Sequence, residues 1–223
     1  MDLTPLYGLR LRTDRLELRW PTEDELVELA RVSEGGVHDP GEMPFVVPWT
    51  DAIGEPGFIE AFVDHHLGLR RSWSPEDWSL ELGVWTADGP IGVQGLLARD
   101  FAAGRELKSG SWLAQRSHGR GYGTEMRAAI LELAFRGLGA QAATSSVLES
   151  AGASARVSEK LGYVDAGESW VEVRGECQLD RQLRLTRDRW IDRERISVRI
   201  SGLEPCLPLF GLTGPPEPWA RSC

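Results

Sequence analysis

Apolar and polar residues alternate along the start of the chain, which is the pattern of strands with one buried face. The alternation covers 9–20 and is broken by a short turn in the middle. Thr22 is followed three residues later by Glu25, the spacing of a helix capping box, and Leu26 and Leu29 then begin an apolar helical stripe. The chain is therefore predicted to begin with strands followed by a helix.

The middle of the chain is predicted to be an antiparallel meander. Glycines and prolines interrupt 33–52, so this stretch is expected to be irregular, and a helix is expected over about 56–71. Alternating strands over 78–86 and 91–100 are joined by a tight hairpin turn. A third strand, at about 106–115, follows a short connection and completes the meander.

The pattern changes after the third strand of the meander. Apolar residues at three- and four-residue steps predict a helix over 124–138, and 142–148 is a strand without charge. A short helix over 154–161 precedes two more strands, at about 163–174 and 178–186. A strand–helix–strand order implies a parallel or splayed strand pair within a mixed sheet. Meander, crossover and hairpin together predict an α+β fold.

Composition limits the function classes. The chain has 223 residues, 41% apolar and 26% charged, which suits one domain with decoration. None of its apolar runs reaches the roughly 20 residues of a membrane span, and the N-terminus lacks a signal-peptide pattern. We therefore expect a cytoplasmic protein with no membrane partner.

The charge and the cysteines exclude further classes. The net charge is −9 without an obvious basic stripe, so no nucleic-acid partner is expected. Cys177, Cys206 and Cys223 are scattered and form no CxxC motif. We expect neither a disulfide framework nor a metal site from them.

A glycine-rich loop between a predicted strand and a predicted helix is the most informative segment. Gly119, Gly121 and Gly123 allow the backbone to approach an anion closely, and the first turn of the helix adds free N–H groups. His118 and Arg120 supply positive charge locally. A Walker loop would need a Gly-Lys-Ser/Thr ending, which is absent. The loop predicts a diphosphate site, and a glycine-rich turn without a ligand is the alternative.

This segment resembles the acyl-CoA signature of GNAT acyltransferases. Trp112-Leu113 is followed by the run 118–125, in which Gly121 and Gly123 match and His118 stands where Gln or Arg is usual. Downstream, Ser154 and the run 159–163 resemble the second motif of the family. The usual Asn of that motif is replaced by Ala151, which removes one contact to the pantetheine arm.

Further segments narrow the resemblance. Thr13 with 15–19 is similar to the start of the Rim-type branch, which acetylates protein N-termini. Segments within 36–50, at 77–80 and at 207–210 are similar to an actinobacterial branch that includes a succinyl-CoA-dependent transferase.

The resemblance implies a GNAT fold, with a mixed, mostly antiparallel sheet, a splayed central strand pair and flanking helices. The GNAT domain is expected over 1–200, and 201–223 is a proline-rich apolar extension. An apolar tail that proline keeps from being helical is expected to dock onto this or another subunit. This tail and the nine tryptophans suggest a homo-oligomer.

The implied activity is acyl-CoA-dependent N-acyl transfer. A succinyl or acetyl group would move from CoA to the primary amine of a small molecule or peptide by direct attack, with no metal. Two alternatives remain open: an acetyl-CoA-dependent protein N-terminal acetyltransferase and a catalytically silent CoA-binding module. The resemblance implies these CoA-binding residues: Trp112, Leu113, Ala114, His118, Gly119, Arg120, Gly121, Tyr122, Gly123, Thr124 and Ser154.

The catalytic residues are less constrained by the sequence. Rim-type proteins often have Glu at the position of Lys108, and a lysine serves as a base only if its pKa is strongly lowered. Asp100 is our first candidate for the base and His38 the second, while Tyr163 is the candidate that protonates the leaving thiolate. A turn carboxylate, a solvated histidine and a core tyrosine are the structural alternatives.

The irregular 36–50 segment is expected to line the acyl and acceptor pocket. Phe45 and Trp49 would wall it. The distal carboxylate of a succinyl group would need a cationic partner, for which Arg99, Lys108 and His38 are unranked candidates.

Overall fold

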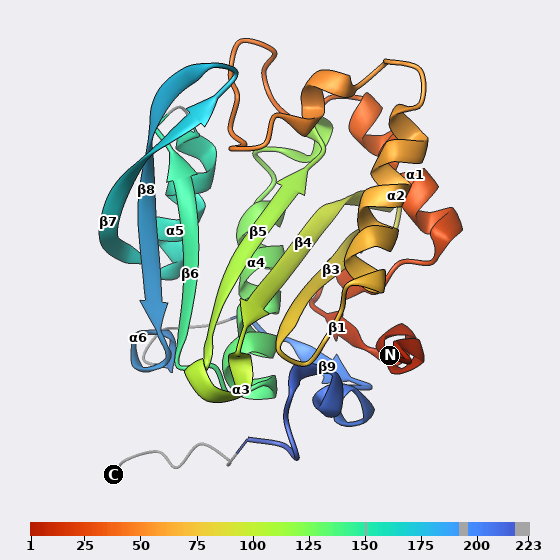
Figure 1. Cartoon of the computed structure of the whole chain (residues 1–223), viewed down its shortest axis with the longest axis vertical. Helices are drawn as coiled ribbons and strands as arrows, with labels where there is room; N and C mark the ends of the chain where they lie inside the picture. Colours follow the sequence, from red (N-terminus) through yellow and green to blue (C-terminus); the bar gives the residue numbers. More distant parts are fainter. Residues whose placement is uncertain (150, 192–195, 217–223) are drawn as a thin grey trace.

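The computed structural model describes residues 1–149, 151–191 and 196–216. They form one nine-stranded sheet in the order β7-β8-β6-β5-β4-β3-β2-β1-β9, with helices against both faces (Figure 1). The strands are β1 Arg10–Arg12, β2 Glu17–Arg19, β3 Asp77–Thr86, β4 Gly89–Arg99, β5 Glu106–Leu113, β6 Ala142–Leu148, β7 Val164–Val173, β8 Glu176–Thr186 and β9 Arg199–Ser201. The helices are α1 Glu23–Glu34, α2 Phe58–Arg71, α3 Phe101–Gly104, α4 Tyr122–Glu132, α5 Gly152–Leu161 and α6 Arg187–Ile191.

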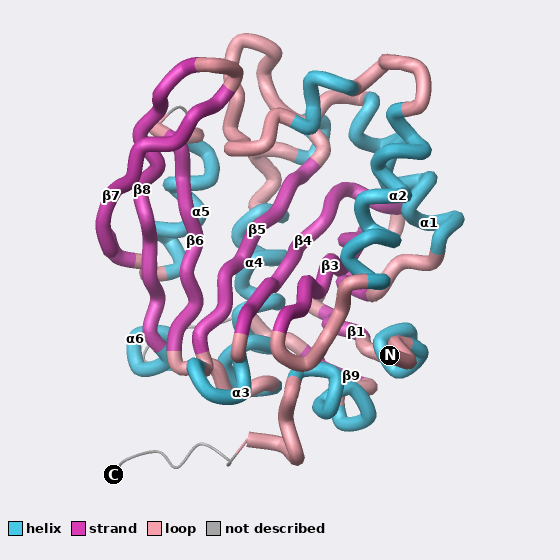
Figure 2. Tube along the Cα trace, in the orientation of Figure 1, coloured by secondary structure: helices cyan, strands magenta, loops and turns pink. Residues whose placement is uncertain are grey.

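The sheet is divided at its centre. β5 and β6 are parallel neighbours, but their pairing ends after Lys108 and Thr144. β5 stays paired with β4 on its other side as far as Leu113 opposite Gly92. In Figure 2, β6 diverges from β5 beyond the short paired stretch. The predicted mixed, mostly antiparallel sheet with a splayed central pair is confirmed.

Two hydrophobic clusters hold the helices on opposite faces of the sheet. α1 and α2 cover one face through a cluster that contains Leu29, Phe62 and Trp112. α4 packs on the other face, within the larger cluster. The Thr22 capping box at the start of α1 is present, as the sequence predicts.

Several elements differ from the predicted boundaries. The short connection after β4 contains the helix α3, for which the sequence carries no helical pattern. The helix predicted over 124–138 begins at Tyr122 and ends in a π-helical turn, Leu133–Gly137. The three-residue strand β9 follows the predicted hairpin later in the chain and pairs with β1.

The described part of the C-terminal extension packs on the chain's own core. The 3₁₀ helix Glu204–Phe210 places Phe210 against Trp78, with ring centroids 4.9 Å apart. The indole N–H of Trp73 donates to the carbonyl of Leu209 at 2.9 Å. Cys206 is buried here, and burial raises the pKa of its thiol to about 11. Cys223 lies outside the described residues, and the predicted homo-oligomer stays a prediction.

The helices formed by the described residues are all too short or too polar to cross a bilayer.

Candidate active site

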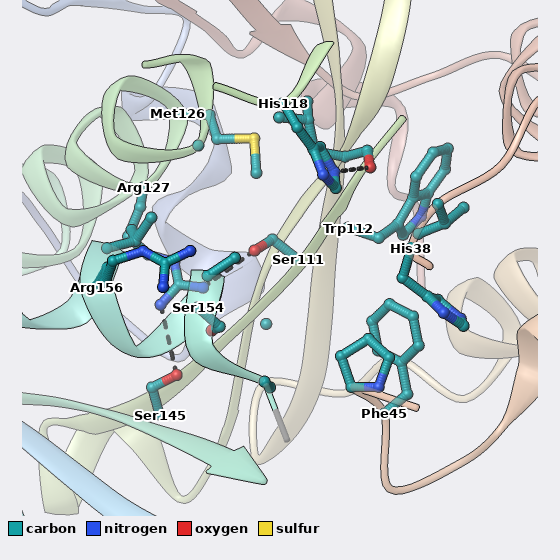
Figure 3. A pocket seen from close by; sticks show the side chains of 18 of the residues that line it. His38, Phe45, Ser111, Trp112, His118, Met126, Arg127, Ser145, Ser154 and Arg156 are labelled. Carbon is teal, nitrogen blue, oxygen red and sulfur yellow. Dashed lines mark hydrogen bonds between the residues drawn. The ribbon is translucent and has the colours of Figure 1, made fainter. Parts of the chain in front are cut away.

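A cavity of about 760 Å³ occupies the place where β5 and β6 separate. Its walls come from segments far apart in the sequence: the 37–49 segment, β5, the loop before α4, α4 itself, the end of β6, α5 and β8 (Figure 3). Both faces of the divided sheet therefore contribute to one continuous space.

The glycine-rich loop presents unpaired backbone donors to this cavity. Gly119 and Gly121 have φ of 73° and 82°, a left-handed conformation that favours glycine. Gly121 precedes α4 without a side-chain cap, and the first helical bond runs from the Glu125 N–H to the Gly121 carbonyl at 3.1 Å. The N–H groups of Tyr122, Gly123 and Thr124 therefore lie in the uncapped first turn, and all three residues line the cavity. This is the donor arrangement that binds phosphate groups.

The N-terminus of α4 is held by the turn between β1 and β2. The buried carboxylate of Glu125 accepts from the Thr13 hydroxyl at 2.6 Å and from Arg15 Nε at 2.7 Å. Arg15 also donates to the Arg120 carbonyl at 3.0 Å, and its guanidinium lies 4.7 Å from the centroid of the Tyr122 ring. The Thr13–Arg15 segment that resembles the Rim-type start therefore fixes the loop.

The free edge of β5 supplies further donors. The Ala114 N–H is already donated to the Ile91 carbonyl at 2.8 Å, so Ala114 cannot offer it to a ligand as expected. Successive N–H groups of a strand point to opposite edges, which directs those of Ser111 and Leu113 toward the gap beside β6. His118 Nε2 donates to the Leu113 carbonyl at 2.8 Å and ties the loop to the end of β5.

A buried arginine links the two halves of the sheet. Arg127 of α4 is 4% exposed and lines the cavity. Its guanidinium donates to Ser111 at 3.0 Å and to Ser145 at 3.4 Å (Figure 3). It also donates to Gln94 at 3.3 Å, so it contacts three different strands. Arg127 was not among the predicted site residues, although a lone charge within the apolar run 126–131 was a usable signal.

α5 adds the second half of the expected coenzyme site. Ser154 and Ala151 both line the cavity, and the Ser154 N–H donates to the Ala151 carbonyl at 3.0 Å. Arg156 and Lys160, one turn apart on the same helix, also line it and were not singled out from the sequence. Together with His118 they make the side of the cavity near α4 and α5 basic.

The 37–49 segment closes the opposite side with aromatic rings. The Phe45 ring lies 5.7 Å from that of His38 and 5.5 Å from that of Trp49, and Trp49 lies 5.7 Å from Trp112. An ion pair between Asp51 and Arg174 connects the following residues to the β7–β8 hairpin.

The His38 ring is held in one orientation. Its Nδ1 lies 2.8 Å from the Asp39 carbonyl, which can only accept, so Nδ1 carries a proton. In the neutral ring, Nε2 is then the acceptor for the Thr50 hydroxyl at 2.7 Å.

Five of the sequence-derived candidates lie outside the cavity lining, namely Asp100, Arg99, Arg120, Ala114 and Tyr163. Asp100 follows the far end of β4, where its N–H donates to the Glu76 carbonyl at 2.6 Å, so the structure does not bring this carboxylate to the site. Arg99 points to solvent and pairs with Asp77 at 3.1 Å. Arg120 is exposed and contributes only its carbonyl, to Arg15.

Tyr163 lies behind the cavity wall. Its hydroxyl is buried 3.2 Å from Ser109 Oγ, and Ser109 rather than Tyr163 lines the cavity. Burial raises the pKa of Tyr163, against the lowering effect of the Arg127 charge, so the phenol stays protonated.

Comparison with solved structures supports the same fold. The ribosomal-protein α-N-acetyltransferase RimL in complex with coenzyme A is 14% identical with a TM-score of 0.64, over 79% of this chain and 97% of that one. RimJ of Mycobacterium smegmatis in complex with CoA-disulfide is 15% identical with a TM-score of 0.63, over 86% and 92%. A spermidine N-acetyltransferase chimera of SpeG from Vibrio cholerae and hSSAT is 15% identical with a TM-score of 0.62, over 81% and 100%.

The sequence itself matches a family model. The model for the acetyltransferase (GNAT) domain matches residues 15–164, which include the α4 loop, β5, β6 and α5. The general reaction of this family is the acyl-CoA-dependent acylation of amines. The chain belongs to the GNAT acetyltransferase family.

Proposed function

We propose that this protein transfers an acyl group, succinyl in preference to acetyl, from acyl-CoA to a primary amine by direct attack on the thioester. One observation carries the proposal. A single cavity joins the uncapped N-terminus of α4 to the free edge of β5 and to the aromatic 37–49 segment. Diphosphate, thioester and amine can therefore be held in one continuous space.

The coenzyme would be held by backbone donors and basic side chains. The N–H groups of Tyr122, Gly123 and Thr124 suit the diphosphate, and Arg156 and Lys160 add positive charge beside it. An N–H of Ser111 or Leu113 on the free edge of β5 would stabilise the oxyanion that develops on the thioester carbonyl. Pre-positioning of both reactants would supply much of the rate acceleration.

Two side chains would handle the protons. The amine nitrogen forms a bond to the carbonyl carbon and loses a proton, which His38 Nε2 would accept once Thr50 gives up that position. The carbon–sulfur bond then breaks, and the thiolate would receive a proton from Tyr163 through the Ser109 hydroxyl. This route replaces Asp100, which lies at the far end of β4.

The preference for succinyl rests on one cation near the acceptor side. Lys108 lines the cavity, whereas Arg99 is engaged by Asp77 at the surface and His38 is neutral while it serves as the base. The distal carboxylate of a succinyl group would make a charge-assisted hydrogen bond with the Lys108 ammonium. An acetyl group carries no charged group that could bind Lys108.

The coenzyme site is tested with Gly121→Glu. A side chain at φ 82° is strained, and a carboxylate at this point would repel the diphosphate. Calorimetry should show CoA affinity falling at least about tenfold, a change of about 1.4 kcal/mol. Gly175→Ala, at φ 79° in the β7–β8 turn, is the matched control for strain and should bind CoA normally. Unchanged affinity in the Gly121 variant would refute the assigned site.

The donor preference is tested by turnover of acetyl-, propionyl- and succinyl-CoA with an amine panel. We expect succinyl-CoA to have the highest kcat/KM and Lys108→Met to lower it selectively. A wide preference for acetyl-CoA would remove the succinyl assignment. Coenzyme binding without turnover on any amine would instead favour a silent CoA-binding module.

A further inference from the structure

Asp180 of β8 is a buried carboxylate with an incomplete set of hydrogen bonds. It is 4% exposed, and its Oδ2 accepts from the Gln182 side-chain amide at 2.7 Å. Its Oδ1 has no hydrogen-bond partner among the described residues. A buried carboxylate is costly unless donors satisfy it, and this one lines the cavity. The site therefore lacks a donor that a ligand can supply.

The strand register shows on which side of the sheet Asp180 lies. Lys108 pairs with Thr144, and Thr144 pairs with Arg184, four residues from Asp180. Side chains at even separations share a face of a sheet, so Asp180 lies on the face of Lys108. Ser145, which Arg127 contacts from α4, lies on the opposite face. Asp180 thus faces away from the diphosphate loop, on the side of the 37–49 segment.

The register also gives the level of Asp180 along the strands. β5 and β6 run parallel from the Lys108–Thr144 pair, so Trp112 and Leu148, each four residues further on, lie at the same level. Asp180 is paired with Leu148. It is therefore level with the part of β5 where the proposed function holds the thioester.

The lateral separation is too large for contact with the reacting nitrogen. β5 and β8 are two strand spacings apart, or about 10 Å, before the splay adds more. Asp180 would therefore reach a different part of the acceptor. The exposed carboxylates of Asp39 and Glu42 line the same cavity and favour the entry of a cation.

Building on the proposed function, we infer that Asp180 binds a second ammonium group of the acceptor. The substrate class is then an amine that carries a further cationic group several bonds from the nitrogen that is acylated. An ammonium group supplies the donor that Oδ1 lacks and neutralises the buried charge. Asp180, the proposed anchor for this second ammonium group, lies far from the attacking nitrogen and leaves that nitrogen free to lose its proton.

The inference is tested by comparing putrescine with n-butylamine, which has the same carbon chain but one amine. Asp180→Asn keeps an acceptor for Gln182 and nearly the same volume, and a thermal unfolding curve checks that it folds. We expect its kcat/KM for putrescine to fall about tenfold to a hundredfold through a higher KM, as for loss of a charged hydrogen bond. Its kcat/KM for n-butylamine should stay within about twofold of the wild type.

Asp165→Asn is the matched control, because Asp165 lies on the same hairpin but at the surface, paired with Arg181. It should turn over both amines like the wild type. An equal effect of Asp180→Asn on both amines, or none on either, would overturn the inference.

A binding measurement separates this inference from the proposed function. Putrescine is titrated into each protein at saturating CoA in a calorimeter. If no amine is turned over but Asp180→Asn weakens putrescine binding at least tenfold, the proposed function fails and the anchor stands. If putrescine binds equally to both proteins, or to neither, the anchor is wrong whatever the turnover shows.

Discussion

His66 makes the stability of this protein depend on pH in a way that can be calculated. It lies on α2 and is 7% exposed. Its ring lies 4.8 Å from that of Phe62, which belongs to the cluster that also contains Trp112. Burial is the main cause that lowers its pKa from 6.5 to about 3, and the charges of His65 and Arg70 add to it. The native state therefore keeps this ring neutral under conditions where the unfolded chain protonates it.

The pH dependence of stability that His66 causes follows from the difference between its native and unfolded pKa values. A histidine with a depressed native pKa loses stability as pH falls below its unfolded value of 6.5, down to about 3. Between pH 7.5 and pH 5 the loss works out at about 2 kcal/mol, since each pKa unit is worth about 1.4 kcal/mol.

The measurement is urea unfolding of the wild type and His66→Gln at both pH values. Other groups titrate as well, so each variant is compared with the wild type by its loss of unfolding free energy between pH 7.5 and pH 5. The test quantity is the loss in the wild type minus the loss in the variant. We expect about 2 kcal/mol for His66→Gln and about zero for His65→Gln, which changes the exposed neighbour. Parallel pH dependence of wild type and His66→Gln would refute the assignment of a neutral buried ring.

Three further predictions concern other buried groups. Burial raises the pKa of Glu81 from 4.5 to about 7, so this carboxyl contributes stability below pH 4.5 that is lost as pH rises to about 7. Unfolding at pH 5 and pH 8 should show that Glu81→Gln abolishes a decline of about 2.5 kcal/mol in the free energy of unfolding. Phe210→Ala should cost about 3–5 kcal/mol in chemical unfolding because it empties the space beside Trp78, and a cost below 1 kcal/mol would contradict the packing. Glu125→Gln should loosen the loop that Arg15 holds, so calorimetry should find CoA binding several-fold weaker. Glu17→Gln, which removes the partner of Arg12 on β2, should leave CoA binding unchanged.

Local sequence patterns were enough to predict most of the helices and strands. The alternation along 78–100, the capping box at Thr22 and the uncharged run 142–148 each become the expected element, because these signals come from neighbours in sequence. The splayed pair followed from the resemblance, and the register confirms it.

The cavity residues were predictable only where they belong to a short sequence motif. The glycine loop and Ser154 reach the cavity as a sequence motif would place them. The role proposed for Asp180 could not be predicted from the sequence, because it depends on a register between β6 and β8 that brings Asp180 level with Trp112. Asp100 lies away from the cavity for the same reason. A residue can be placed at a strand end from the sequence, but the sequence does not show which end of the sheet holds the ligand. The Ala114 N–H was lost to a cross-strand bond with Ile91, which no motif records.

The divided sheet has a mechanical consequence. Only three residue pairs join β5 to β6. Beyond them the two halves of the sheet share no backbone hydrogen bonds, and the Arg127 guanidinium of α4 connects them instead. An extended molecule lodged in the opening would act as a substitute strand and stiffen both halves at once. Amide exchange in β6 and β8 should therefore slow when coenzyme is added, even though most of its contacts would be with α4 and β5.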